Sequence, residues 1–297
     1  MTFLDLLTSD YTIHLLILIG IYLILSQSLN LTFGLGQLFN LAHVASYAIG
    51  AYTTALLSTE GQASFATCVI ASMALSGLFS ILLGVIALRL ASDYFSIGTL
   101  AFSAIVSALL INWKSVTHGV LGIPGIPRPE LGSIDFYQNG PFLIMLLVFV
   151  LATQTIFYIL MHGRFGRSLR ALAEYEQAAA VLGKDTALLR NIAFLASSAA
   201  AGLAGSFFAY YLNYIDPSSF SLNEMIFILT IVIVGRPGSF FGAIGSTVFL
   251  VLLPEPLRFV AFPSAYLGPL RQLMYAAILF GIVLWKRESL FPKQRKV

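Results

Sequence analysis

The feature that most constrains this chain is a series of long apolar runs separated by short polar segments. Most runs reach the roughly 20 residues that a helix needs to cross a hydrocarbon layer about 30 Å thick. The runs are approximately Thr12–Thr32, Phe39–Leu57, Ala63–Leu88, Tyr94–Asn112, Pro141–Met161, Ile192–Tyr214, Met225–Val234, Ser239–Leu253 and Leu270–Trp285. Charged residues make up only 10% of the chain. We therefore expect an all-α polytopic membrane protein, a single transmembrane domain over residues 1–297 with about eight or nine transmembrane helices.

The two runs on either side of Gly235–Gly238 are shorter than the rest. At roughly 10 and 15 residues, they would extend about 15 and 23 Å as helices. They are either short tilted spans or a re-entrant pair, because a broken helix is tolerated where neighbouring helices bury it. Both alternatives return the chain to the side of the membrane from which the pair started.

Lys and Arg residues are distributed unevenly among the polar segments. Because loops that stay in the cytoplasm carry an excess of these residues, we expect the N-terminus outside and the C-terminus inside. Outside would then lie only Lys114, Arg128, Arg258 and Arg271. The cytoplasmic loop would cover about 162–191, and the external loop about 113–140. No Lys or Arg precedes the first run, so it is expected to be an uncleaved span rather than a signal peptide.

The expected external loop is rich in proline. Pro124, Pro127 and Pro129 favour extended or turn geometry over regular helix. The loop is therefore either a simple connector or a stiff surface that receives a soluble partner.

Gly163–Arg190 is the longest charge-rich segment of the chain. Several of its residues recur at three- and four-residue steps and would share one face of a helix over about Arg167–Leu182. These residues are Leu169, Leu172, Ala173, Glu176, Ala180 and Gly183. A helix of this kind is suited to receive a push from a cytoplasmic partner.

The second half of this segment carries helix-ending signals. Three alanines from Ala178 onward keep the expected helix thin, which lets another backbone approach closely. Gly183 is suited to end the helix in a left-handed conformation. Asp185 or Thr186 can then cap the next helix, which enters the membrane near Ile192.

Four polar residues fall at membrane depth near the first two spans. Asn30 lies in the first run, and Gln37, Asn40 and His43 follow a three-residue step at the start of the second. One face of the second span would therefore either line a pathway or form hydrogen bonds between helices. His43 alone is expected to be a satisfied residue of the bundle.

The sequence lacks the motifs of several other protein classes. It contains no phosphate-binding loop, no H-E-x-x-H motif, no Cys/His cluster and no G-x-S-x-G motif, so neither an enzyme nor a metal site is expected. The net charge of +3 is spread over membrane edges, which does not indicate nucleic-acid binding. Asp93, Glu224 and Glu255 all lie at the edges of apolar runs. The absence of a carboxylate within a run disfavours an ion-coupled carrier.

Small residues recur four positions apart in two of the runs. They are Ser198 and Gly202, Ala201 and Gly205, and Gly242 and Ser246. Because helices associate in lipid through close backbone approach at such residues, we expect a compact bundle.

Several stretches together resemble the permease subunits of branched-chain amino acid ABC importers, the LivH/LivM type and most closely LivM. The stretches are Leu29–Leu57, Leu88–Phe102, Asn191–Phe220 and Ile231–Arg258. They occur in the order found in that family. Related permeases for urea and short amides are similar in the same stretches, so the cargo stays open between these classes.

The resemblance implies an ABC-importer permease fold in a bacterial inner membrane. The implied partners are a homologous second permease subunit, two cytoplasmic ATPase subunits that bind ATP and Mg, and an external solute-binding protein that delivers branched-chain or related amino acids. The chain itself would bind no cofactor and would not be an enzyme. An ion-coupled secondary carrier and a non-transporting membrane scaffold are the competing classes.

The resemblance also implies which residues couple this chain to the ATPase. The cytoplasmic loop of such permeases carries an E-A-A-x-x-x-G signature, which aligns with Gln177, Ala178, Ala179 and Gly183, and Gln177 replaces the acid. The segment would move with the ATPase as a rigid body. The implied coupling residues are Arg167, Leu169, Arg170, Leu172, Ala173, Glu174, Glu176, Gln177, Ala178, Ala179 and Gly183.

Overall fold

The computed structural model describes residues 10–87, 92–129, 136–255 and 264–285. The elements in chain order are α2 (Asp10–Leu29), the π-helical turn η1 (Asn30–Leu35), α3 (His43–Thr59), α4 (Phe65–Ala87), α5 (Ser92–Asn112), α6 (Lys114–Thr117), η2 (Gly119–Leu121), β1 (Ile123–Pro124), α7 (Asn139–His162), α8 (Arg164–Glu174), α9 (Glu176–Val181), α10 (Thr186–Leu212), β2 (Tyr214–Ile215), η3 (Pro217–Phe220), α11 (Leu222–Val234), α12 (Phe240–Leu252) and α13 (Ser264–Trp285).

The prediction of an all-α polytopic membrane protein is confirmed. Among the described residues, five helices are long and apolar enough to cross a membrane, and α11 and α12 are shorter apolar helices. The sheet found in this part of the chain is a single antiparallel pairing of β1 with β2. The expected number of eight or nine crossing helices stays a prediction.

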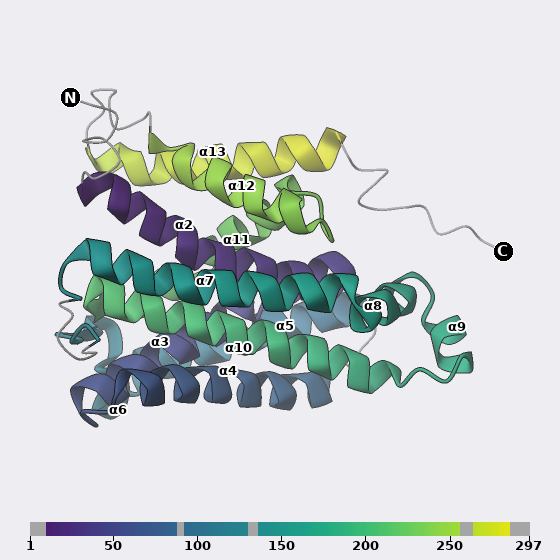
Figure 1. The fold of residues 1–297 in the computed structure, drawn as a ribbon, viewed down its shortest axis with the longest axis horizontal. Coiled ribbons are helices and arrows are strands. Elements are labelled where there is room, and N and C mark those ends of the chain that lie inside the picture. Colours follow the sequence, from purple (N-terminus) through teal and green to yellow (C-terminus); the bar gives the residue numbers. More distant parts are fainter. Residues whose placement is uncertain (1–9, 88–91, 130–135, 256–263, 286–297) are drawn as a thin grey trace.

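The long helices lie side by side along the longest dimension of the molecule (Figure 1). One end of the bundle carries α8 and α9, and we call it the α9 end. The opposite end carries α6 and the start of α2, and we call it the α6 end. The charge-rich segment and the proline-rich segment therefore lie at opposite ends, as the expected cytoplasmic and external loops require.

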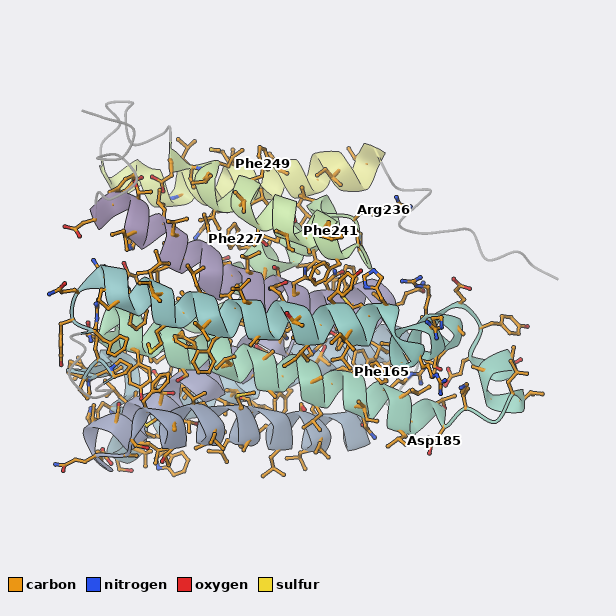
Figure 2. All side chains as sticks on the ribbon, viewed as in Figure 1. Phe165, Asp185, Phe227, Arg236, Phe241 and Phe249 are labelled. Carbon is orange, nitrogen blue, oxygen red and sulfur yellow. The ribbon has the colours of Figure 1, made fainter. Side chains whose placement is uncertain are left out.

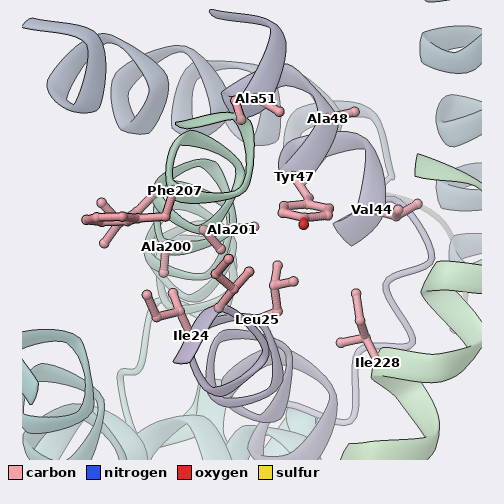
Figure 3. Packing of buried hydrophobic residues seen from close by; sticks show 14 of the residues in the cluster. Ile24, Leu25, Val44, Tyr47, Ala48, Ala51, Ala200, Ala201, Phe207 and Ile228 are labelled. Atoms are coloured by element: carbon pink, nitrogen blue, oxygen red, sulfur yellow. The ribbon is translucent and has the colours of Figure 1, made fainter. Parts of the chain in front are cut away.

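The core forms around α10, which packs between α3 and α4. A methyl group on Gly50 would collide with the backbone of Gly202, and one on Gly205 would collide with the carbonyl of Tyr47. The predicted close approach through Gly202 and Gly205 is therefore confirmed. Figure 3 shows neighbouring buried side chains of this core, among them Ile24, Leu25, Tyr47, Ala201 and Phe207.

α11 and α12 form a tight hairpin of two 13-residue helices, each extending about 20 Å. A methyl group on Gly242 would collide with the carbonyl of Gly235. Ser246 Oγ donates a hydrogen bond to the carbonyl of Ile231 at 2.7 Å. The turn of the hairpin lies at the α9 end, where Figure 2 labels Arg236.

α11 begins in the interior of the bundle rather than at its α6 end. Tyr22 Oη donates a hydrogen bond to Glu224 Oε1 at 2.7 Å, and Tyr22 lies about 18 Å from the start of α2. The ring of Phe220, just before α11, packs 5.1 Å from that of Tyr47, which lies about 18 Å from the end of α3. Glu224 thus lies at the edge of its apolar run, as expected, but near the middle of the bundle in depth.

The second span begins later than the sequence pattern predicts. The expected helix begins near Phe39, whereas α3 begins at His43. Gln37 has a φ of 51°, a left-handed conformation that cannot continue a helix. Asn40 Oδ1 accepts a hydrogen bond from the backbone of Ala42 at 3.0 Å. The helical spacing predicted for Gln37, Asn40 and His43 is therefore wrong, because the first two lie in the preceding loop.

Candidate functional site

α8 lies against the α9 end of the bundle, in contact with α7, α10 and η1. Leu169 and Leu172 are buried in this contact, which explains their spacing on an otherwise charged helix. Gly166 passes so close to the carbonyls of Leu160 and Met161 that a side chain would collide with them. This glycine permits the tight turn from α7 into α8.

The predicted single helix over Arg167–Leu182 is wrong. Tyr175 has φ −154° and ψ 91°, an extended conformation that separates α8 from α9. The two halves therefore do not share one helix face. A rigid body extending from Arg167 to Leu182 is replaced by two short helices joined at one extended residue.

Ala179 faces inward rather than outward. Its side chain is 3% exposed, whereas the neighbouring Ala178 and Ala180 are exposed. Of the three alanines expected to let another backbone approach closely, Ala179 thus packs on this chain itself, while Ala178 and Ala180 remain accessible. Bulk at Ala179 would disturb the packing of α9 on its own chain.

The α9 end carries exposed apolar side chains that the sequence reasoning missed. Val181 is 87% exposed, Leu182 is 79% exposed, and the ring of Tyr175 is 66% exposed. Together with Ala178, these residues form a small apolar surface, which we call the α9 tip. Its sequence signal was the presence of large apolar residues inside the one segment that is otherwise charged and outside the apolar runs.

The junction between α9 and α10 forms as the sequence predicts. Gly183 has a φ of 77°, and the Gly183 N–H donates to the carbonyl of Ala180 at 2.9 Å, while the Lys184 N–H donates to that of Ala179 at 3.1 Å. This is the double hydrogen bond of a glycine-terminated helix. Asp185 Oδ1 accepts a hydrogen bond from the Leu188 N–H at 2.9 Å, so Asp185 is the cap of α10.

The remaining predicted coupling residues lie on α8 and α9 or directly after them. Arg167 donates to the carbonyl of His162 at 3.0 Å and so satisfies a carbonyl at the end of α7. Glu176 forms an ion pair with Arg190 at 2.9 Å, which links α9 to α10. Exposed residues are Arg167, Arg170, Glu174, Glu176, Gln177, Ala178 and Gly183, while Ala173 is half-buried.

Asn30, the first of the predicted pathway residues, connects two parts of the bundle. Its Nδ2 donates to the carbonyl of Ser239 at 3.0 Å, and its Oδ1 accepts from the Gly238 N–H at 2.8 Å. Gly34 approaches the Gly238 backbone so closely that a methyl group would collide with it. Asn30 therefore attaches η1 to the turn of the α11–α12 hairpin.

His43 is fully buried and connects α2, α3 and α10. Its Nε2 lies 3.3 Å from the carbonyl of Leu25 and 3.1 Å from Ser28 Oγ. Because a carbonyl only accepts, Nε2 carries the proton. Nδ1 lies 3.4 Å from Ser197 Oγ, a residue of α10. In this conformation Asn30 and His43 make hydrogen bonds between elements, and Gln37 is the exposed member of the predicted set.

The coupling segment and this polar cluster are adjacent through η1. α8 contacts η1, and Leu169 shares a buried cluster with Leu31 and Leu35 of η1. η1 in turn is attached to the α11–α12 turn by Asn30. A continuous set of contacts therefore joins α8 to the α11–α12 hairpin.

At the α6 end, the Arg128 side chain donates several hydrogen bonds to residues at the end of the proline-rich segment. Its Nη1 donates to the carbonyls of Phe136 at 3.0 Å and Tyr137 at 2.9 Å, and to Asn139 Oδ1 at 3.1 Å. Its guanidinium lies 5.2 Å from the centre of the Phe142 ring. Beside Arg128 is a cavity of about 440 Å³. Its lining residues are Ser58, Gln62, Ala63, Ser64, Phe65, Pro127, Arg128, Pro129 and Tyr210.

The sequence of this chain matches a known family of membrane proteins. Residues 11–284 match the family model described as the branched-chain amino acid transport system / permease component. The chain is 33% identical to the high-affinity branched-chain amino acid transport system permease protein LivM of Escherichia coli, over 97% of this chain and 72% of that protein.

Two further relatives carry similar descriptions. LivM of Salmonella typhimurium is 34% identical, over 93% of this chain and 68% of that protein. A probable branched-chain amino acid transport permease protein LivM of Methanocaldococcus jannaschii is 24% identical, over 96% and 94%. No solved structure matches this chain significantly.

Proposed function

This chain belongs to the branched-chain amino acid transport permease family, and from this premise we propose that an ATPase subunit docks on its α9 tip to drive the import of a branched-chain amino acid. The family consists of transport permease subunits, which are not enzymes, and its members are multi-pass membrane proteins of ABC importers. Neither the urea or amide permease nor the ion-coupled carrier is favoured by these relatives.

The exposure of Val181 and Leu182 is the observation that carries the docking proposal. Two large aliphatic side chains at 87% and 79% exposure, outside the apolar spans, indicate a surface that another protein covers. Tyr175 and Ala178 extend the same surface, and Gln177 provides an exposed polar group beside it. A short, small-residue helix of this shape fits a groove on a partner.

The break at Tyr175 changes how movement would be transmitted. α9 would move with the ATPase, whereas α8 is fixed to the bundle through Leu169 and Leu172. The capped junction at Gly183 and Asp185 connects α9 directly to α10, the central helix of the core. A movement of the α9 tip would therefore reach the core through α10 and switch the bundle between two packings.

The remaining subunits follow from the same proposal. Two ATPase subunits would supply ATP and Mg at the α9 end, and a homologous permease subunit would pair with this chain within the inner membrane. An external solute-binding protein would meet the α6 end, where Arg128 holds the proline-rich segment in one shape. The N-terminus would lie outside and the C-terminus in the cytoplasm.

The test uses the complete importer in proteoliposomes, with both permeases, both ATPases and the binding protein. Ala178→Trp places bulk on the α9 tip, and Ala66→Trp makes the same change at an exposed position of α4. We expect Ala178→Trp to lower ATP-dependent uptake at least about tenfold. The importer that carries Ala66→Trp should retain its bound ATPase subunits. Full uptake and full ATPase content in the Ala178→Trp importer would contradict the proposal.

A further inference from the structure

A carboxylate lies near mid-depth of the bundle and is only partly covered. Tyr22, about 18 Å along α2 from the start of that helix, donates a hydrogen bond to Glu224 Oε1 at 2.7 Å. Glu224 itself is half-buried. One oxygen is therefore fixed in place, and the carboxylate is not sealed inside the protein.

The surroundings of this carboxylate are apolar and aromatic. The ring of Phe227 packs edge-on at 5.0 Å from that of Tyr22, and Tyr275 lies 4.5 Å beyond Phe227. Among the described residues, the one ion pair joins Glu176 to Arg190 at the α9 end, so no described Lys or Arg forms an ion pair with Glu224. Its observed hydrogen-bond partner is a neutral hydroxyl.

Position and charge together point to a ligand. Ionisable groups within a membrane are costly, face a pathway or the bundle interior, and normally pair with an opposite charge. A role as the acidic residue in the first turn of α11 accounts for a stabilised helix start. It does not account for a carboxylate that is held at mid-depth by a tyrosine of another helix, is partly accessible, and forms no ion pair with any described Lys or Arg.

We propose that Glu224 binds the α-ammonium group of the amino acid that this chain transports. This inference rests on the proposed function and names the recognition group for its cargo. Tyr22 orients the carboxylate, and the second oxygen accepts from the ammonium group. The aliphatic side chain of the cargo would lie against nearby buried apolar groups such as Leu25 and Ile228 (Figure 3). An ammonium group would supply the positive charge that no described Lys or Arg supplies to this carboxylate through an ion pair.

Glu224→Gln is the variant that isolates the charge. Glutamine has the same size and keeps an oxygen that can accept from Tyr22, so the bundle should remain folded and the ATPases bound. In the complete importer, we expect ATP-dependent leucine uptake to fall at least about tenfold. ATP hydrolysis stimulated by the loaded binding protein should stay within about twofold of wild type, because the α9 tip is untouched. Glu60→Gln, at an exposed position at the end of α3, is the matched control and should bind leucine as wild type does when the binding protein is left out.

A binding measurement tests the ammonium group itself. Radiolabelled leucine is bound to the assembled permease–ATPase complex without the binding protein. Unlabelled leucine or 4-methylpentanoate, which has the same carbon chain without the amine, is then added as competitor. We expect leucine alone to compete effectively on wild type, and Glu224→Gln to lose most of the specific binding. Tyr22→Phe should retain the charge and show a smaller loss.

The outcomes separate this inference from the proposed function. Equal uptake by wild type and Glu224→Gln, with ATP dependence intact, would overturn the role of Glu224 alone. Equal competition by 4-methylpentanoate would overturn it as well. A wild-type importer that takes up leucine without its ATPases would overturn the proposed function, and the inference with it.

Discussion

Asn30 Oδ1 accepts a hydrogen bond from the backbone N–H of Gly238 at 2.8 Å, across 208 positions of the chain. The same side chain donates from Nδ2 to the carbonyl of Ser239 at 3.0 Å. An amide is required here because it both donates and accepts in one plane. Asn30 is fully buried, so water cannot take the place of either hydrogen bond if it is lost.

Substitution of Asn30 should weaken the attachment of η1 to the α11–α12 turn. Asn30→Asp keeps an acceptor for Gly238 but turns a carboxylate oxygen toward the carbonyl of Ser239, which leaves that carbonyl unsatisfied. We expect a loss of about 1–3 kcal/mol in the free energy of unfolding, measured by thermal denaturation of the purified protein. Asn112→Asp, an exposed amide that bonds within its own helix, is the control. Equal stability of the two variants would show that the Asn30 bonds contribute little.

Gly183 should be replaceable by asparagine more easily than by alanine. Its φ of 77° costs an L residue about 1–2 kcal/mol, and asparagine tolerates that conformation best among the non-glycine residues. No neighbouring atom would block a side chain at this position, so any loss reports on backbone strain alone. Hydrogen exchange of the α9 amides should rise in Gly183→Ala and rise less in Gly183→Asn. Unchanged exchange in both variants would argue against the left-handed junction.

A methyl group at Gly202 should destabilise the core, whereas one at Gly245 should not. A side chain at Gly202 would meet Ser72 and Ser76 of α4, and overpacking of this kind costs about 1–3 kcal/mol. Gly245 is also helical but has open space around its added methyl group. Comparing the melting temperatures of Gly202→Ala and Gly245→Ala tests the α4–α10 packing. A loss of stability in Gly245→Ala alone would contradict it.

The apolar runs predicted the positions of the helices well because lipid imposes one simple requirement on every span. The run Tyr94–Asn112 matches α5 (Ser92–Asn112), and Pro141–Met161 matches α7 to within two residues at each end. Local signals were equally effective at Gly183 and Asp185, since a left-handed glycine and a capping carboxylate depend on a few neighbouring residues.

The failures share one physical cause, which is tertiary packing. Nothing local at Tyr175 interrupts the helical periodicity, yet the chain extends there while Leu172 and Ala179 are buried on either side of it. Gln37 adopts a left-handed conformation where Gly34 meets the α11–α12 turn. The depth of Glu224 depends on the segment that holds β2 and η3 before α11. An apolar run shows where a helix begins and ends in the sequence, but not how deep that helix begins in the bilayer.

The most direct test of the central claim is a cross-link from the α9 tip to the ATPase. Val181→Cys places a thiol on the exposed tip, and the native Cys68 is fully buried, so it should react little. A short bifunctional thiol–amine reagent is added to the assembled importer in membranes, and the products are separated and identified by mass spectrometry. The account predicts an adduct between Val181→Cys and the ATPase subunit, and none from Ala66→Cys at the α6 end. An ATPase adduct from Ala66→Cys with none from Val181→Cys would contradict it.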